Sequence, residues 1–413
     1  MITLKTDFIL GYASIILLIV ALAGCASGQM LQSQSMDAIM QNLSHEDAKV
    51  RGQAAWMLGK SGDVRAVDPL IQALEDSDSN VREWAVLSLV KIGKPSIEPL
   101  AAALKKEDDS VKWQAAAALG LINDSNSTQP LLFALQSNNS TARYWAAAAL
   151  GQIRDNRSRD ALISALGDSN ETVRDEAGWA LRSVEGAGAV ELLIKLLKDG
   201  DSNRRLGAAK ALGDLADASY VLPLIEALQD REPGVRSEVA SSLGRINDSQ
   251  ATVPLIGVLG DPEEQVRRAA IKALTAIGSQ ATEPLILALN ESDNNTQEAA
   301  ALALGRIGEE RSIGPLIWAF KNGDRRVRHA AVGALADING SLALPPLVTI
   351  LDNPNAGSDL RADAAWALGE MDNPGAREYL IYSMANDKDS SVRMSAARAL
   401  KNIGSVTVPE YSI

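Results

Sequence analysis

The chain has 413 residues, of which 46% are hydrophobic and 22% are charged, so it is able to bury a core and is not disordered throughout. It carries 40 Lys and Arg residues against 52 Asp and Glu residues, and this net charge of −12 disfavours general nucleic-acid binding. A single cysteine and two histidines exclude an internal disulfide, a cysteine-based zinc site and most histidine-rich metal centres.

The first feature along the chain is an apolar run of 16 residues at positions 8–23, preceded by Lys5. Its length is short for a membrane-spanning helix and suits a secretory signal. The run ends in Leu22-Ala23-Gly24-Cys25, which resembles the lipobox of bacterial and archaeal lipoproteins. This resemblance implies a signal peptide over residues 1–24, a lipid on Cys25 and a tether over residues 25–36, on the outer side of the cell membrane. Because Asp7 departs from the basic start of such signals, an uncleaved signal anchor is the alternative.

Beyond the tether, one pattern recurs every 30 to 33 residues through residues 37–404. Leu stands eight residues after the first position of every unit, and Ala stands four residues after it in all units but one. Apolar residues at this spacing share one face of a helix, so each unit is predicted to contain an amphipathic helix. The first positions are Val50, Val81, Val111, Ala142, Val173, Arg204, Val235, Val266, Thr296, Val327, Leu360 and Val392.

A shorter apolar segment precedes each of these helices and commonly opens with a proline, as at Pro69, Pro223 and Pro315. Proline in the first turn of a helix loses no hydrogen bond, so the segment is predicted to be a helix that begins there. Since one helical hairpin cannot bury its apolar face alone, successive hairpins must stack. The sequence therefore predicts an all-α fold, an α-solenoid superhelix of about twelve hairpins over residues 37–404, with a tail over residues 405–413.

The segment Asp76-Ser77-Asp78-Ser79-Asn80-Val81-Arg82, with the Ala and Leu that follow, resembles the HEAT repeat, and the short period is similar to the phycobilisome-lyase (PBS lyase) branch of HEAT-like repeats. In that family, matching Asp and Arg residues form a structural ladder between adjacent repeats, and a bidentate Arg–carboxylate pair suits that role. The alternative is a basic row for an anionic ligand. The residues assigned to the ladder are Arg82, Arg174, Arg205, Arg236, Arg267, Asp76, Asp168, Asp199, Asp230 and Asp261.

Aromatic residues recur on the second helices at positions that point away from the predicted core. The resemblance implies that these helices line the concave face of the superhelix, where aromatic rings would suit a bound protein or peptide. The alternative is that the rings fill gaps between Ala-rich repeats, which is the packing predicted for Trp84 and Trp145. The candidate partner-binding residues are Trp56, Trp113, Tyr144, Trp179 and Trp366.

Two enzyme classes share this repeat type, but the sequence supports neither. Deoxyhypusine hydroxylase, an oxidoreductase, is a HEAT-like protein whose di-iron site resembles paired His-Glu dyads. This sequence has one such dyad, His45-Glu46, and His329 precedes Ala330. Nothing marks a bilin site of the bilin-lyase kind. The sequence therefore predicts a non-enzymatic protein-binding scaffold with no catalytic residue, metal, cofactor, nucleic acid or small-molecule substrate. A bilin-lyase-like or hydroxylase-like relative and a passive surface spacer are the alternatives.

Asn-X-Ser/Thr sequons are frequent in the predicted turns and raise the hypothesis of glycosylation. Because turns favour Asn, Asp and Ser together, turn composition is the simpler explanation. The sequons begin at Asn42, Asn123, Asn126, Asn138, Asn139, Asn156, Asn170, Asn247, Asn290, Asn294 and Asn339.

Overall fold

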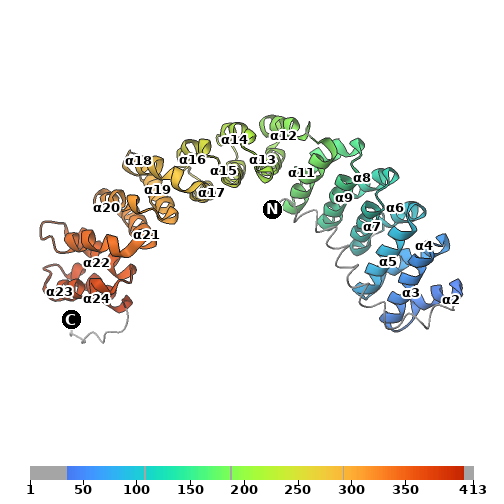
Figure 1. Ribbon diagram of the computed structural model, residues 1–413, viewed down its shortest axis with the longest axis horizontal. Helices are drawn as coiled ribbons and strands as arrows, with labels where there is room; N and C mark the ends of the chain where they lie inside the picture. The colour runs from blue at the N-terminus through green and yellow to red at the C-terminus, as the bar shows by residue number, and fades with distance from the viewer. Residues whose placement is uncertain (1–34, 107, 187, 292, 404–413) are drawn as a thin grey trace. The chain divides into compact units, whose positions relative to one another are not determined.

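The computed structural model describes residues 35–106, 108–186, 188–291 and 293–403, and within these ranges the chain forms helices and turns without a strand (Figure 1). The chain divides into two compact units. One comprises Met1–Ala165 and Trp179–Gly186, and the other comprises Leu166–Gly178 and Ala187–Ile413. The predicted signal peptide, Cys25, nearly all of the tether and the tail over residues 405–413 lie outside the described residues.

In the first unit, short first helices alternate with longer second helices, and each pair packs as a hairpin (Figure 1). The second helices pack against one another in one layer and the first helices lie in another, as α3 contacts α5 and α4 contacts α6. The first helices are α2 (Met36–Gln41), α4 (Val67–Gln72), α6 (Ile97–Ala103), α8 (Thr128–Ala134) and α10 (Arg159–Ala165). The second helices are α3 (Ala48–Ser61), α5 (Ser79–Ile92), α7 (Asp109–Ile122), α9 (Ser140–Ile153) and the end of α11 (Glu171–Glu185).

The second unit continues the same alternation. Its first helices are α12 (Gly188–Asp199), α14 (Val221–Ala227), α16 (Thr252–Gly257), α18 (Thr282–Glu291), α20 (Ile313–Asn322) and α23 (Arg377–Asn386). Its second helices are α13 (Ser202–Leu215), α15 (Pro233–Ile246), α17 (Glu264–Ile277), α19 (Asn294–Ile307), α22 (Ser358–Glu370) and α24 (Ser390–Asn402). The long helix α21 (Arg325–Leu351) holds one second helix and the following first helix. This stacking of hairpins confirms the predicted α-solenoid fold class.

Short 3-10 helices form tight turns, most of them between one hairpin and the next, and η1 and η3 within a hairpin. They are η1 (Asn42–Ser44), η2 (Val64–Ala66), η3 (Ala73–Glu75), η4 (Lys94–Ser96), η5 (Ser125–Ser127), η6 (Asn156–Ser158), η7 (Ala218–Tyr220), η8 (Ser249–Ala251), η9 (Gly278–Ala281), η10 (Glu310–Ser312) and η11 (Pro374–Ala376). Left-handed caps at Gly62, Asn123, Asn247 and Gly308, with φ between 54° and 78°, end the preceding second helices.

The core consists of the predicted Leu and Ala columns. In α5, Val81, Ala85 and Leu89 are fully buried, and the residues that match Ala85 and Leu89 in the other second helices are buried in the same way. At the position of Val81, the matching Val50, Arg204 and Leu360 are half-buried. Fully burying a leucine side chain contributes roughly 1.5–3 kcal/mol, so a column of twelve leucines supplies a large part of the stability. That column is Leu58, Leu89, Leu119, Leu150, Leu181, Leu212, Leu243, Leu274, Leu304, Leu335, Leu368 and Leu400.

Neighbouring second helices approach closely at a glycine that follows the buried leucine. A Cβ built on these glycines would lie 2.3–2.8 Å from an Ala or Ser of the next repeat, closer than real side chains tolerate. The close-approach pairs are Gly59–Ser88, Gly120–Ala149, Gly151–Ala180, Gly213–Ser242, Gly244–Ala273, Gly305–Ala334 and Gly369–Ala399. Where serine stands in the pair, its hydroxyl donates across the interface, as from Ser242 to the carbonyl of Ala209 at 2.9 Å.

One connection differs from the predicted pattern. The sequence predicts a turn after Ile338 and a new helix at Pro346, whereas α21 is helical from Arg325 through Leu351 with two prolines inside it. Proline within a helix removes a backbone donor and crowds the preceding turn, which costs about 3 kcal/mol. Both parts of α21 are held in the core, by Leu335 before the prolines and Leu347 after them, and this packing offsets the loss.

The close approach of α19 and α21 predicts that Gly305→Ala lowers stability. The added methyl would lie 2.6 Å from the Cα atom of Ala334, and overpacking of this kind costs roughly 1–3 kcal/mol. Thermal unfolding followed by far-UV circular dichroism measures the effect.

The matched control is Gly333→Ala, one residue from Ala334 on α21, where an added Cβ meets nothing within 4 Å. Since alanine is favoured over glycine inside a helix by about 1 kcal/mol, this control should raise the unfolding temperature. Equal shifts in the two variants would contradict the close-approach explanation.

Candidate functional site

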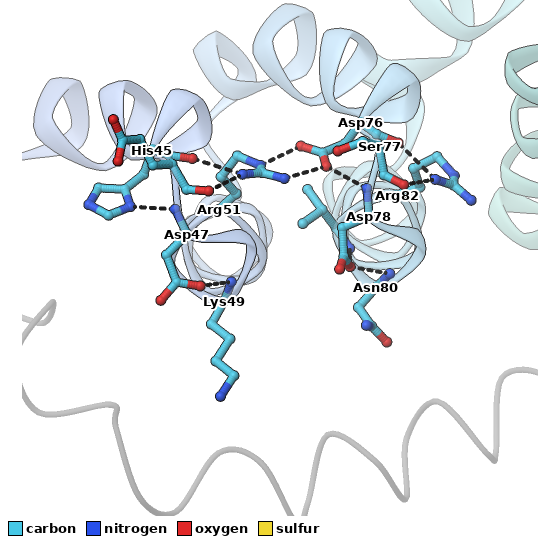
Figure 2. Close-up of polar contacts among 11 residues, drawn as sticks. His45, Asp47, Lys49, Arg51, Asp76, Ser77, Asp78, Asn80 and Arg82 are labelled. Carbon is cyan, nitrogen blue, oxygen red and sulfur yellow. Dashed lines mark hydrogen bonds and ion pairs between the residues drawn. The ribbon is translucent and has the colours of Figure 1, made fainter.

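An Arg–Asp pair ties the first two hairpins together (Figure 2). Arg51 on α3 donates from Nε to Oδ2 of Asp76 at 2.6 Å and from Nη2 to Oδ1 at 2.8 Å, in the bidentate geometry that makes such pairs strong. The same guanidinium donates from Nη1 to the backbone carbonyls of His45 and Glu46, at 2.8 and 2.9 Å. One arginine therefore fixes the turn of its own repeat and holds the turn of the next.

The same pairing recurs in the second unit, always between an arginine and an aspartate of the following repeat. Arg205 reaches Asp230 at 2.6 Å and Arg236 reaches Asp261 at 2.7 Å, each across 25 residues. Arg361 and Asp387 form the corresponding pair near the end of the chain. The backbone carbonyl of each aspartate accepts a hydrogen bond from the arginine six residues later, as that of Asp76 does from Arg82 at 2.8 Å (Figure 2). Arg236 does both, because it also donates to the carbonyl of Asp230 at 2.8 Å.

The remaining arginines assigned to the ladder hold their own turns. Arg174 and Arg267 each donate to the backbone carbonyl of the aspartate six residues earlier, Asp168 and Asp261, at 2.7 and 2.6 Å. The carboxylate of Asp168 accepts the backbone N–H of Asn170 at 2.8 Å. The side chain of Asp199, at the end of α12, lies outside the described residues.

These pairs set the protonation of the aspartates. Burial by itself raises the pKa of Asp230, but the hydrogen bond from Arg205 and the backbone N–H of Glu232 outweigh burial, so the pKa lies below its ordinary value. The balance is the same for the pKa of Asp261 beside Arg236. Each of these aspartates is therefore an anion at neutral pH, and its charge is balanced by an arginine of the preceding repeat, so no bound ligand is needed to explain it.

A second set of ties lies in the 3-10 turns that connect one repeat to the next, and the sequence analysis missed it. Arg157 donates to the carbonyl of Ser125 at 2.7 Å, and Arg311 donates to the carbonyl of Ser279 at 2.8 Å, each across 32 residues. Within its own turn, Arg157 also pairs with Asp155. The signal in the sequence is an acidic residue two positions before an arginine in the turn, as in Asp155-Asn156-Arg157.

The candidate aromatic residues of the first unit lie on its second helices, where they contact the next helix or neighbours on their own helix. Trp113 on α7 stacks on Trp145 on α9 with ring centroids 5.9 Å apart, and Tyr144 meets the edge of Trp145 at 5.7 Å. The ammonium of Lys60 lies 5.2 Å from the ring centre of Trp56. All of these rings are half-buried. Trp113 and Trp145 fill space between α7 and α9, as the gap-filling alternative predicts, and each ring still leaves part of its surface exposed to solvent.

The other tryptophans of the second helices also pack on small or planar neighbours. A Cβ built on Gly52 would lie 3.2 Å from the ring of Trp84, and one built on Gly151 would lie 3.3 Å from the ring of Trp179. In the second unit, Trp366 on α22 stacks on His329 at 4.3 Å. The missing side chain of each glycine leaves room for the ring of the following repeat.

A tryptophan that the sequence analysis did not single out is more exposed than these. Trp318 on α20 is 46% exposed, as part of a set of apolar residues on the outer surface of the first helices. Its signal in the sequence is the position three residues after Pro315, where other repeats carry Gln72 or Glu226.

The sequon residues have local structural roles. Asn123 and Asn247 are left-handed caps, and Asn139 accepts the backbone N–H of Ala142 at the start of α9. In two other sequons the hydroxyl residue, Thr128 or Ser158, is fully buried. Turn and cap chemistry thus explains these asparagines, and glycosylation stays a hypothesis.

No group of three or more His, Cys, Asp or Glu side chains that could hold a metal ion occurs within the described ranges. His45, the histidine of the one His-Glu dyad, accepts the backbone N–H of Asp47 through Nδ1 at 3.0 Å (Figure 2). Within the same ranges, no helix has the length and apolar character needed to cross a bilayer. The apolar run at residues 8–23 lies outside them.

The ladder predicts that Asp230→Asn lowers stability at neutral pH by about 2 kcal/mol, because Arg205 would remain buried without its ionic partner. The pKa of Asp230 is lower in the folded than in the unfolded chain, so its contribution is present above the ordinary aspartate pKa of about 3.9 and is lost as pH falls through the folded value. Stability of the variant should therefore fall less on acidification below about pH 4. Thermal unfolding at a series of pH values measures this.

The control is Asp337→Asn, at an exposed position of α21, which should leave the stability at neutral pH close to that of the wild type. An identical pH dependence in the wild type and Asp230→Asn would contradict the assignment of this carboxylate.

Comparison with known proteins reveals one repeat family along the chain. A family model described as HEAT repeats matches residues 36–119, 97–182, 160–224, 221–285, 282–361 and 356–411. The chain is also similar to a curated protein, the uncharacterized phycocyanin operon protein Z of Pseudanabaena tenuis (strain PCC 7409), at 34% identity over 89 residues. That match covers 21% of this chain and 44% of the relative.

Solved structures share the fold. Kap121p bound to Nup53p aligns over 88% of this chain with a TM-score of 0.53 and 16% identity, and Kap121p bound to Pho4p aligns over 88% with a TM-score of 0.52 and 16% identity. The chain spans about half the length of Kap121p, 48% in both alignments. At 16% sequence identity, the similarity to Kap121p shows a shared arrangement of helices.

Proposed function

The chain belongs to the HEAT-repeat family, and from this premise we propose that it is a non-enzymatic scaffold that binds a protein or peptide along the face of its second helices. The observation that carries the proposal is the row of half-buried aromatic rings on the second helices of the first unit, at Trp56, Trp113, Tyr144 and Trp179. Rings already held by neighbouring helices lose little further freedom on binding, and tryptophan is favoured where a few residues dominate an interface.

The charges of the chain support the same reading. The arginines and aspartates that recur along the sequence form ion pairs and hydrogen bonds within and between repeats, as Arg205 does with Asp230 and Arg236 does with Asp261. Because these charges already have partners in the protein, an aromatic contact surface is favoured over a basic row that binds an anion. Kap121p, similar in fold, was solved in complexes with Nup53p and with Pho4p, so a stack of this kind suits protein partners.

We further propose that the scaffold is anchored by a lipid on Cys25, on the outer side of the cell membrane, after removal of residues 1–24. The support is the sequence Leu22-Ala23-Gly24-Cys25 after the apolar run, together with the absence of any other cysteine from the sequence. The uncleaved signal anchor is the alternative arrangement. Either arrangement keeps the repeats next to a membrane, where a scaffold recruits partners to a surface.

One comparison bears on the bilin-lyase-like alternative, because the curated relative is named after a phycocyanin operon. That relative is described as uncharacterized and its match covers about a fifth of the chain. The repeat stack and its aromatic face extend well beyond this match, and the protein-binding scaffold is therefore the function that we propose.

The aromatic face predicts that Trp56→Ala combined with Trp179→Ala reduces partner recovery. Cross-linking in native membranes, followed by purification of the chain, measures partner per scaffold. Loss of dominant interface residues weakens binding by on the order of 30-fold or more, so the partner should nearly disappear.

The matched control is Phe133→Ala, an exposed aromatic residue on α8 in the layer of first helices, which should retain the partner. Circular dichroism checks that both proteins fold. Undiminished recovery by the double variant would count against the second-helix face, and failure to recover any partner from the wild type would favour the passive spacer.

The anchor predicts that the protein recovered from native membranes lacks residues 1–24 and carries a lipid mass on Cys25, which intact mass spectrometry measures. Cys25→Ser should abolish both changes, because the thiol receives the lipid before cleavage. An unprocessed mass in the soluble fraction would refute the anchor and leave the scaffold itself to be judged by the partner experiment.

A further inference from the structure

The last described hairpin, α23 with α24, has an apolar flank that no following helix covers within the described ranges. Ile381 on α23 is 44% exposed, whereas the matching residue of every earlier first helix is buried or half-buried, as Ile71 is at 8%. Met384 is half-buried, although the matching apolar residue is buried in each repeat from Leu74 through Leu351. Three residues apart, Ile381 and Met384 share one flank of α23, which we call the open flank.

The exposure of the open flank has a positional cause. In the second unit, first helices pack side by side, as α16 does with α18 and α18 does with α20, so each covers one flank of the helix before it. Among the described residues of that unit, α23 alone lacks a following first helix, and only there is the residue at the position of Ile381 exposed. A segment placed beside α23 would therefore bury the open flank in the way that inner repeats bury theirs.

Charge at this end disfavours a second copy of the chain as the cover. The helix α24, which packs against α23, carries the exposed basic residues Arg398 and Lys401. Two copies that met through this end would bring these like charges together, which weakens binding. Within the sequence, residues 404–413 carry one charged side chain, Glu410, and its sign is opposite to that of the exposed residues on α24.

Residues 404–413 also begin beside the open flank. Arg377, the first residue of α23, donates from Nη2 to the backbone carbonyl of Ile403 at 3.2 Å. The chain therefore leaves α24 next to the start of α23. A segment of this length spans up to about 33 Å when it is extended, whereas a helix of the length of α23 spans about 15 Å. The segment is long enough to run along the whole of α23.

The sequence of this segment repeats that of α23 within the period of the chain. Glu378-Tyr379-Leu380-Ile381 corresponds to Glu410-Tyr411-Ser412-Ile413, and Gly404 stands at the cap position that ends earlier second helices. Pro409 takes the place of Arg377, with which α23 begins, and proline is favoured at the first position of a helix. The match to the HEAT-repeat model also continues through residue 411.

We propose that residues 404–413 pack beside α23 in the register of a first helix and cover the open flank. The residues directly before and after Leu380 lie on opposite flanks of α23, because successive residues of a helix are about 100° apart. Ile381 belongs to the open flank, so the position of Tyr379 faces the preceding first helix. Tyr411 corresponds to Tyr379, and it therefore meets Ile381.

A second contact comes from Val408. It corresponds to Ala376, which is fully buried, so Val408 points into the space between the segment and the hairpin. Ser412 stands where α23 has Leu380, so the segment lacks the leucine that anchors the other first helices. It is held by few apolar contacts, and a single substitution is enough to release it.

The test is hydrogen exchange of the full chain, measured by mass spectrometry. In the wild type, the amides of residues 404–413 should exchange more slowly than those of a free peptide of the same sequence. Tyr411→Asp places a charge in the apolar contact and should speed exchange in residues 404–413 and in α23 by about 10-fold or more, because burial of one such side chain corresponds to at least that factor. Circular dichroism confirms that the variant is folded.

The matched control is Ser405→Asp, which adds the same charge to the same segment at a position where earlier repeats have Asp63 or Asp124. Exchange in this control should stay as in the wild type. Equal exchange in the wild type and Tyr411→Asp would overturn the proposal, as would free-peptide exchange of residues 404–413 in the wild type. Protection that grows with protein concentration would also overturn it, because a second copy would then cover the open flank.

Discussion

The structure depends on the fact that a single hairpin of this chain cannot bury its own apolar face. Each second helix completes its core only when the next one lies against it, at the distance set by contacts such as Gly305 against Ala334. At one end of the hairpins, bidentate pairs such as Arg236 with Asp261 hold successive turns. In the 3-10 connections, Arg157 and Arg311 reach the carbonyls of the preceding repeat. Packing, salt bridges and hydrogen bonds thus all stabilise the contact between one repeat and the next.

The periodic part of this arrangement was predictable from the sequence, because burial repeats with the period of the chain. The Leu column that ends at Leu400 and the caps at Asn123 and Asn247 follow from local patterns that a single repeat contains. Contacts between repeats were harder to infer. A helical wheel places Trp113 opposite the core, but it does not include the neighbouring helix whose Trp145 stacks on that ring. Likewise, proline spacing predicted a turn before Pro346, where packing on both sides keeps α21 helical.

The candidate site shows the same limit. The sequence identifies which arginines and aspartates matter, but the side-chain partner of an aspartate is the arginine of the preceding repeat, and the arginine six residues later serves the backbone. Among the described residues, the aromatic rings of the first unit and the exposed apolar side chains that include Trp318 take no part in these ties. The first group lies on second helices and the second on first helices.

The pairing of a closely packed glycine with a polar tie at the turn has a mechanical consequence. Between α15 and α17, the contact of Gly244 with Ala273 leaves no slack for sliding, but a point contact between two helices still permits a small rotation. The salt bridge from Arg236 to Asp261 lies away from this contact, at the turn, and restricts that rotation. Each interface between repeats is therefore held at two separate places, one apolar and one ionic, so that a change weakening one of them leaves the other in position.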